Sequence, residues 1–260
     1  MIAILLTILS GCARAQQPFD TDDTDVVDRG KWHFETYNQL DLLQHAALPS
    51  KRQNTWNFKF SYGIYKNVEI GADNQMLTIF NAPDPVQPRV AFGYGDMDLS
   101  VKWNLYKEKF GHRMPALGVN LNIEFPTGND KKLLGSGLTD YYLYGIIQKS
   151  VTERIKLRAN AGVVFAGNTQ TGVVGIRSRG TVFTGAASVV RDFTKRLRLG
   201  TEVTGAASTD FDLQRGQLQN KTGGNYKLKD NLSLDFALTA GKYIASPRLG
   251  AQIGFSVDFK

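Results

Sequence analysis

The chain has 260 residues, of which 42% are hydrophobic, 11% aromatic and 26 are glycine, and its formal net charge is +7. This length suits one large domain or two small ones, and the aromatic content excludes a disordered chain. No apolar run approaches the roughly 20 residues that a transmembrane helix needs, so a helical membrane protein is excluded and an all-β protein with many turns is favoured.

The first 15 residues have the pattern of a secretory signal peptide. An apolar core at residues 2–9, with no Lys or Arg before it, precedes Ala13-Arg14-Ala15, which fits an A-x-A cleavage site. Residues 9–12 (LSGC) offer a second interpretation, a lipobox with lipidation at Cys12; a third is a buried first strand. Cys12 is the single cysteine, so no internal disulfide forms. Export argues against nucleic acid as the partner of this basic chain.

Residues 16–29 form an acidic stretch without hydrophobic periodicity. It contains Asp20, Asp22, Asp23, Asp25 and Asp28. We expect an exposed, solvated N-terminal segment in the periplasm, and consider metal binding by the aspartates the weaker alternative.

From residue 30 to the end, apolar and polar residues alternate with the period of two that is typical of β-strands. About twelve strands are predicted, three of them less regular (140–151, 180–192 and 217–226). The other nine lie at residues 32–41, 56–62, 68–73, 96–105, 117–125, 155–165, 197–204, 232–239 and 249–259. Short connections alternate with longer ones, such as 77–94 and 166–179, which fits antiparallel strands with turns at one end and loops at the other.

Alternation alone does not distinguish a soluble sandwich from a membrane barrel. In a sandwich the polar face of each strand meets water on the outside, whereas in a membrane barrel it faces the lumen. Segments of about ten residues match a tilted strand that crosses a bilayer, and aromatic residues such as Trp32, Trp103 and Phe259 lie at segment ends. The polar faces carry charges among small residues, as a wet interior would. We therefore predict a closed antiparallel transmembrane β-barrel at residues 30–260, with short periplasmic turns and longer extracellular loops, since closure leaves no strand edge in lipid.

Four stretches carry a resemblance to a known family: residues 24–35 (TDVVDRGKWHFE), 62–71 (YGIYKNVEIG), 93–106 (GYGDMDLSVKWNLY) and 125–128 (FPTG). In order and spacing the chain resembles the outer-membrane proteins named after the MetA pathway of phenol degradation, which are described as transporters. The resemblance implies a porin-like channel or transporter in the bacterial outer membrane. One departure is that Lys260 follows Phe259, whereas such barrels commonly end on an aromatic residue that the barrel-insertion machinery reads.

The expected function is passive uptake of small solutes, hydrophobic or aromatic ones included. The alternatives are a lipid-modifying enzyme and a structural barrel with a plugged lumen. We expect no enzyme, because no serine lies in a nucleophile setting near His33, His45 or His112, and no metal or cofactor, because metal-ligand spacing is absent.

Parity assigns charged residues to the lumen face. On the first five strands these are Glu35, Asp41, Glu69, Asp73, Asp96, Asp98 and Glu124 with Lys59 and Lys102, and on later strands Lys156, Arg158 and Arg198 with Glu202. One hypothesis is a transverse field between an acidic and a basic wall, which would favour dipolar solutes. The alternative is that these charges pair across strands as a salt-bridged core.

The longer loops carry cations that would be attracted to the phosphates of lipopolysaccharide, although ordinary solvated loop charge is an equal alternative. They are Lys51, Arg52, Lys131, Lys132, Arg177 and Arg179. The expected partners are therefore outer-membrane lipid and lipopolysaccharide, the insertion machinery and an unidentified small solute.

Overall fold

The computed structural model describes residues 18–166, 180–208 and 216–260. Three predicted segments lie outside the described residues. They are the signal peptide or its alternatives at the N-terminus, the loop 166–179 except for residue 166, and the loop 209–215.

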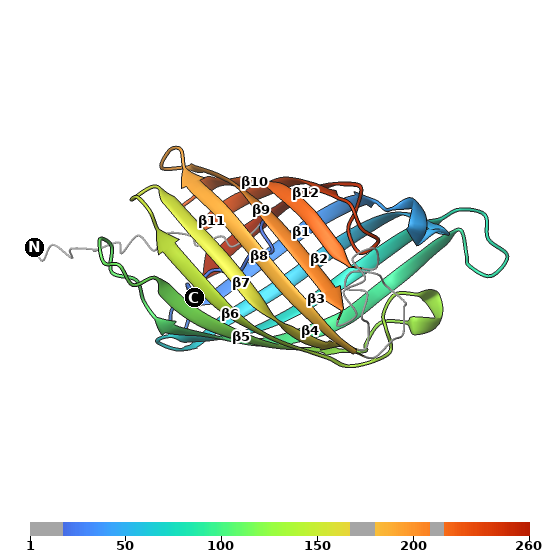
Figure 1. The fold of residues 1–260 in the computed structure, drawn as a ribbon, viewed down its shortest axis with the longest axis horizontal. Coiled ribbons are helices and arrows are strands. Elements are labelled where there is room, and N and C mark those ends of the chain that lie inside the picture. The colour runs from blue at the N-terminus through green and yellow to red at the C-terminus, as the bar shows by residue number, and fades with distance from the viewer. Residues whose placement is uncertain (1–17, 167–179, 209–215) are drawn as a thin grey trace, which may run out of the picture.

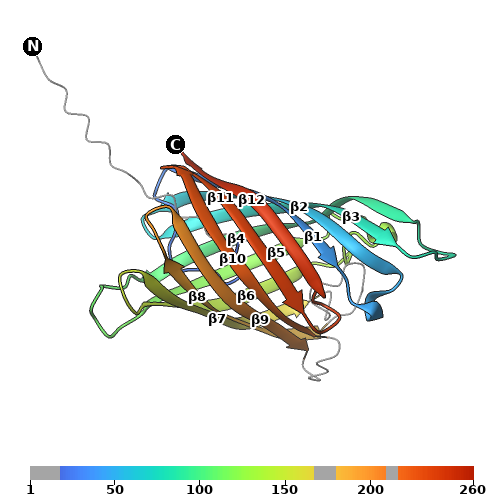
Figure 2. The ribbon, with the colours of Figure 1, turned by 90° about the horizontal axis from the view of Figure 1, so that it is seen from above.

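Twelve β-strands in the described residues close into a barrel, as predicted (Figure 1). Each strand pairs antiparallel with its neighbours in sequence, and β1 closes the barrel against β12. The strands are β1 Trp32–Leu42, β2 Ser50–Tyr65, β3 Val68–Asn81, β4 Val90–Tyr106, β5 Ala116–Phe125, β6 Asp140–Ser150, β7 Ile155–Ala166, β8 Gly180–Asp192, β9 Leu197–Ser208, β10 Gln217–Lys229, β11 Leu232–Gly241 and β12 Leu249–Phe259. They cross the barrel obliquely in both views (Figures 1 and 2), the tilt that closure of a sheet requires.

The connections form two different rims. The short-turn rim holds the connections 66–67, 107–115, 151–154, 193–196 and 230–231, and there Trp32 lies opposite both Phe259 and Tyr62. The long-loop rim holds residues 43–49, 82–89, 126–139 and 242–248 besides the two loops not described. The predicted alternation of short and long connections holds except at 107–115, which is longer than 43–49, 82–89 and 242–248 of the opposite rim.

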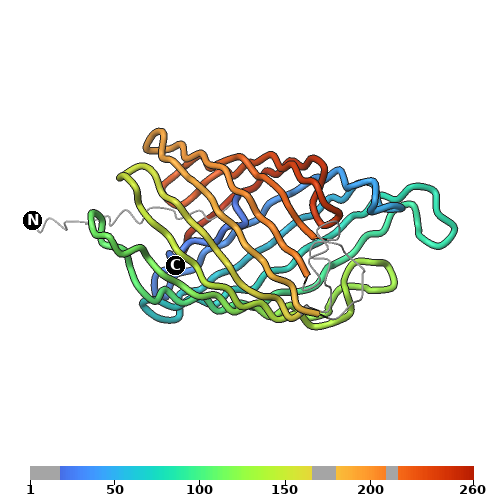
Figure 3. The backbone as a smooth tube through the Cα atoms, viewed as in Figure 1, coloured from blue at the N-terminus to red at the C-terminus, as the bar shows by residue number. Residues whose placement is uncertain are grey.

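Strands β2, β3 and β4 are longer than the predicted segments, with 16, 14 and 17 residues. The connection predicted at 77–94 is reduced to 82–89, and its hairpin projects beyond the rest of the long-loop rim (Figure 3). Alternation fails here because the inner face is also apolar: Leu77, Ile79 and Ala91 pack against Leu134 of the β5–β6 loop. A bulge between Asn74 and Met76 in the β3–β4 register adds to the irregularity.

The barrel surface is apolar and its interior polar. On β4, Leu99, Val101 and Trp103 are more than 40% exposed, whereas Lys102 and Asn104 between and beside them are 3% exposed. A soluble sandwich shows the opposite arrangement, so this distribution identifies a barrel of the membrane-spanning type. Among the described residues no helix is long and apolar enough to cross a bilayer.

Candidate functional site in the barrel lumen

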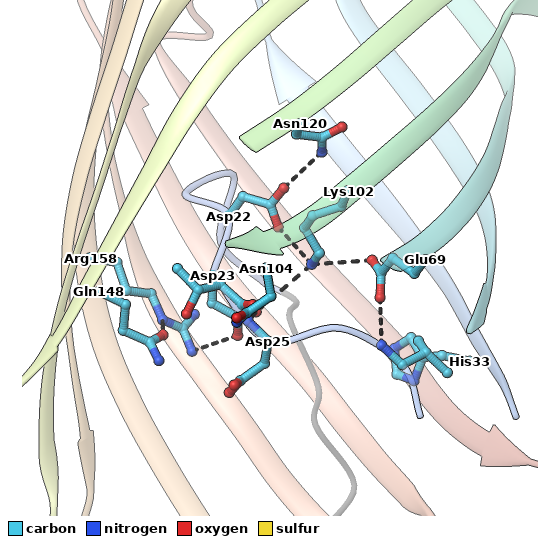
Figure 4. A network of polar contacts seen from close by, with 12 residues as sticks. Asp22, Asp23, Asp25, His33, Glu69, Lys102, Asn104, Asn120, Gln148 and Arg158 are labelled. Carbon is cyan, nitrogen blue, oxygen red and sulfur yellow. Dashed lines mark hydrogen bonds and ion pairs between the residues drawn. The ribbon is translucent and has the colours of Figure 1, made fainter. Parts of the chain in front are cut away.

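Residues 18–28, which we call the lumen segment, lie inside the barrel. The prediction of a solvated tail is wrong for this part of the chain: Thr21, Asp22 and Thr24 are 0%, 4% and 1% exposed. The sequence shows no periodicity here because the segment forms no strand. Its aspartates are instead solvated by polar side chains of the barrel wall, several of which Figure 4 shows around Asp22 and Asp23.

The N-terminal end of the lumen segment contacts β9 and β10. The carboxylate of Glu202 accepts hydrogen bonds from the backbone N–H of Asp20 at 2.9 Å, from the N–H of Thr21 at 2.8 Å and from the Thr21 hydroxyl at 2.7 Å. In return, Asp20 accepts from the Lys221 ammonium at 2.5 Å and from the Gln219 amide at 3.0 Å. This end is therefore held through both backbone and side chains.

The middle of the segment binds the cations of β4 and β7 (Figure 4). Asp22 lies 3.2 Å from the Lys102 ammonium and accepts a 2.9 Å hydrogen bond from the Asn120 amide, while Asp23 lies 2.9 Å from the Arg158 guanidinium. The Lys102 ammonium also lies 3.1 Å from Glu69. Charge-assisted contacts between buried groups are strong when every partner is present, so this cluster joins the segment firmly to the wall.

The C-terminal end passes β3 and β2 on its way to β1. Glu69 accepts a 2.6 Å hydrogen bond from the Val27 N–H, and Lys156 lies 4.0 Å from Asp25. Beside β2 the two backbones nearly touch, since a Cβ on Gly63 would lie 2.2 Å from the Asp28 carbonyl oxygen. Only glycine admits this approach.

The structure thus joins five of the predicted lumen residues through the lumen segment: Glu69, Lys102, Lys156, Arg158 and Glu202. Arg198 instead pairs with Asp192 of β8 at 2.7 Å. Sequence reasoning missed the aspartates of the segment as lumen groups, and it missed Lys221. Parity would have identified Lys221, had the strand at 217–226 shown cleaner alternation.

Three other predicted acids, Asp73, Asp98 and Glu124, form with Asp140 a separate feature on β3 to β6, which we call the acidic row. Asp73 lies opposite Asp98, Asp98 opposite Glu124 and Glu124 opposite Asp140 on successive strands. Asp98 accepts a 2.9 Å hydrogen bond from the Asn122 amide and Glu124 accepts a 2.7 Å bond from the Tyr142 hydroxyl. These partners are neutral, so they solvate the carboxyl groups without balancing their charge.

Other predicted lumen residues have different surroundings. Lys59 lies between two acids, opposite Asp73 of the acidic row on one side and opposite Glu35 of β1 on the other. Asp96 faces the β5–β6 loop, where it accepts from the N–H groups of Gly128 at 2.8 Å and Ser136 at 3.1 Å. Asp41 is buried and accepts from the Gln39 amide at 2.8 Å.

Cavities lie on both sides of the lumen segment. One of about 570 Å³ at the short-turn rim is lined by residues that include Arg198, Asn225 and Ser233. Towards the long-loop rim, cavities of about 200 and 230 Å³ both reach Asp20, the first beside Asp41 and the second beside Tyr144. The first volume is in the range of ordinary small-molecule sites, whereas each of the other two would hold a small solute or a few waters.

His33 does not have the geometry of a catalytic base. Its Nδ1 lies 2.6 Å from Asp258 and its Nε2 3.0 Å from Glu35. Both ring nitrogens therefore donate to carboxylates, and no lone pair is left to activate a nucleophile such as Ser61, its register neighbour on β2. His45 and His112 lie in connections at opposite rims. Within the described residues, no group of three or more His, Cys, Asp or Glu side chains could hold a metal ion.

The cations predicted to attract lipopolysaccharide that the structure describes are exposed at the long-loop rim. Lys51 and Arg52 begin β2, and Lys131 and Lys132 lie in a short 3-10 helix (Asp130–Lys132) of the β5–β6 loop. Arg177 and Arg179 lie outside the described residues. Attraction to lipopolysaccharide stays a prediction.

No family model matches this sequence, and no curated protein matches it. The fold, however, is similar to solved outer-membrane barrels. The COG4313 outer membrane channel from Pseudomonas putida F1 superposes with a TM-score of 0.72 at 14% identity, over 93% of this chain and 100% of that chain. The NanC porin has a TM-score of 0.59 at 11% identity, over 86% and 98%, and the KdgM porin 0.57 at 10%, over 88% and 99%. At these identities the likeness concerns the fold.

Proposed function

We propose that this chain is an outer-membrane channel for the passive diffusion of small solutes. The observation that carries the proposal is a polar lumen inside a barrel with an apolar exterior, with cavities on both sides of the lumen segment. Through Asp20 the segment borders the two cavities towards the long-loop rim. Similarity to solved channels and porins in fold supports the outer-membrane location, and the sequence resemblance supports kinship with the MetA-pathway transporters.

The lumen chemistry restricts the cargo. Charged groups such as Asp20, Asp41 and Lys221 line one of the cavities, and a fully apolar solute would have to displace their solvation. Tyr142 and Tyr144 border the cavity of about 230 Å³ and offer aromatic surface beside these polar groups. A hydrophobic or aromatic solute therefore fits best when it also carries a polar or charged group.

One observation favours a second candidate, a structural barrel with a plugged lumen. The ion pairs of Asp20, Asp22 and Asp23 connect the segment to three separate strands of the wall. A lipid-modifying enzyme has less support, because both nitrogens of His33 are occupied by carboxylates.

Conductance distinguishes the candidates. The full-length mature protein, shown to be folded by heat-modifiable migration on a gel, would be reconstituted in planar bilayers and in liposomes. Discrete conductance steps and liposome swelling with small sugars are the expected result. A folded barrel that neither conducts nor permits swelling would overturn the channel proposal in favour of a structural barrel.

A further inference from the structure

We propose that the lumen segment sets the charge selectivity of the pore: Asp22 and Asp23 neutralise Lys102 and Arg158, which leaves the acidic row to favour cations. This inference rests on the proposed channel function. It assigns Asp22 and Asp23 as specificity-determining residues that act through the wall cations they cover.

The first step is that the deep cations of the wall are covered by the segment. Lys102 and Arg158 are 3% and 4% exposed. Their partners in the segment are Asp22 at 3.2 Å and Asp23 at 2.9 Å. A permeating anion would have to displace these carboxylates before it reached either cation.

The second step is a balance of charge along the segment. Its aspartates Asp20, Asp22, Asp23 and Asp25 meet four wall cations, one each from Lys221, Lys102, Arg158 and Lys156. Two wall carboxylates join these pairs, since Glu69 lies 3.1 Å from Lys102 and Glu202 lies 4.0 Å from Lys221, so this part of the lumen presents no net positive charge. Without the segment, the four cations of the wall would outnumber these two carboxylates.

The third step concerns Asp98 and Glu124 of the acidic row, whose hydrogen-bond partners are neutral. Asp98 and Asn122, and likewise Glu124 and Tyr142, are hydrogen-bonded without a cation in the pair. Asp98 lies four residues before Lys102 on β4, about 13 Å along the strand towards the long-loop rim at the usual rise of a strand. On this wall a cation that enters from that rim meets Asp98 before Lys102, and carboxyl groups in a narrow pore raise the local cation concentration.

The test is the reversal potential of the reconstituted protein in a KCl gradient. The wild type should be cation-selective. In the double variant Asp22→Asn and Asp23→Asn the two wall cations lose the countercharges that the segment provides, while Lys102 keeps Glu69, and the ratio of K⁺ to Cl⁻ permeability should fall by roughly threefold or more. The matched control is Asp28→Asn, which removes one charge from the exposed end of the same segment, where Asp28 pairs with Lys31; its ratio should stay at the wild-type value.

A compensating variant separates electrostatics from rearrangement of the segment. Adding Lys102→Gln and Arg158→Gln to the double variant removes the uncovered cations and should restore cation preference. Heat-modifiable migration would confirm folding in each case. Anion selectivity of the wild type, an unchanged ratio in a conducting double variant, or failure of the compensating variant to restore the ratio would each overturn the inference. Absence of conductance in every folded variant would instead overturn the channel function on which it rests.

Discussion

Two parts of the lumen wall contain buried charged groups, and they differ in how those charges are compensated. Around Lys102 and Arg158, cations and carboxylates alternate in space, and the countercharge comes from the lumen segment. Along Asp73, Asp98 and Glu124, like charges lie opposite one another, and the hydrogen-bond partners of Asp98 and Glu124 are neutral. A buried charge is stable only when it is compensated or can take up a proton. The first part therefore has the properties of a structural core, and the second those of a surface available to ions and solutes.

The largest effect is expected from Lys102→Met, which breaks the compensated part. Asp22, Asp23 and Glu69 would be left as a buried acidic cluster around the missing ammonium. Removing one partner of a buried ionic cluster costs about 3–5 kcal/mol. Urea unfolding in lipid vesicles, followed by tryptophan fluorescence, measures this difference in the free energy of unfolding. A loss below about 1 kcal/mol would show that the cluster is well hydrated.

The next effect is expected from Gly63→Ala, which separates the segment from the wall without changing charge. The new Cβ would lie 2.2 Å from the Asp28 carbonyl oxygen, so the C-terminal end of the segment must shift, at a cost of about 1–3 kcal/mol. Faster cleavage within residues 18–28 by an aspartate-directed protease would report the shift. Gly145→Ala is the matched control, because its Cβ would have an ordinary 4.0 Å contact. Equal cleavage in both variants would contradict the close packing at Gly63.

A smaller effect of opposite sign is expected from Asp98→Asn in the acidic row. Directly opposed like charges destabilise a strand pair, so removing the central one should leave the free energy of unfolding unchanged or raise it by up to about 1 kcal/mol. The same variant should lower cation selectivity in bilayers. The comparison between the two parts of the wall fails if this variant is destabilised as much as Lys102→Met.

The smallest effect is expected at the short-turn rim, outside the barrel. Partial burial raises the pKa of Glu108, but hydrogen bonds from the Lys149 ammonium at 2.7 Å and the Ser150 N–H at 2.9 Å outweigh it and hold the pKa below its usual value. The depressed pKa stabilises the fold above the pKa of the unfolded chain, and this contribution is lost as pH falls through the folded pKa. Glu108→Gln should therefore cost about 0.2–1 kcal/mol at neutral pH. The cost should vanish in acid; a difference that persists there would refute the pKa argument.

The parts of the fold that the sequence predicted are those with a regular local period. The β12 segment is an example, since Ile253 and Phe255 alternate with Gln252 and Ser256 and the structure places them outside and inside. The prediction was poorer on β3 and β4, because Leu77 and Ala91 on the inner face pack against Leu134 from a distant loop. No local pattern distinguishes such a covered strand from a loop.

The candidate site was predicted only in part for the same reason. Parity placed Lys102 and Arg158 on the lumen face, but the aspartates of residues 16–29 have the composition of a solvated tail. Their partners are distant in the chain: Asp22 and Lys102 are 80 residues apart, and Thr21 and Glu202 are 181 apart. Composition does not indicate which distant groups will provide the solvation.

The sequence by itself determined the barrel class, the strand number and the sidedness of the connections. It could do so because the period of two, the segment length and the turn residues are local properties that each strand carries alone. Only the tertiary structure decided that Asp22 and Asp23 lie inside the barrel and which wall charges they cancel. Compensation of buried charge depends on distances between groups far apart in the chain, and those distances exist only once the barrel has closed.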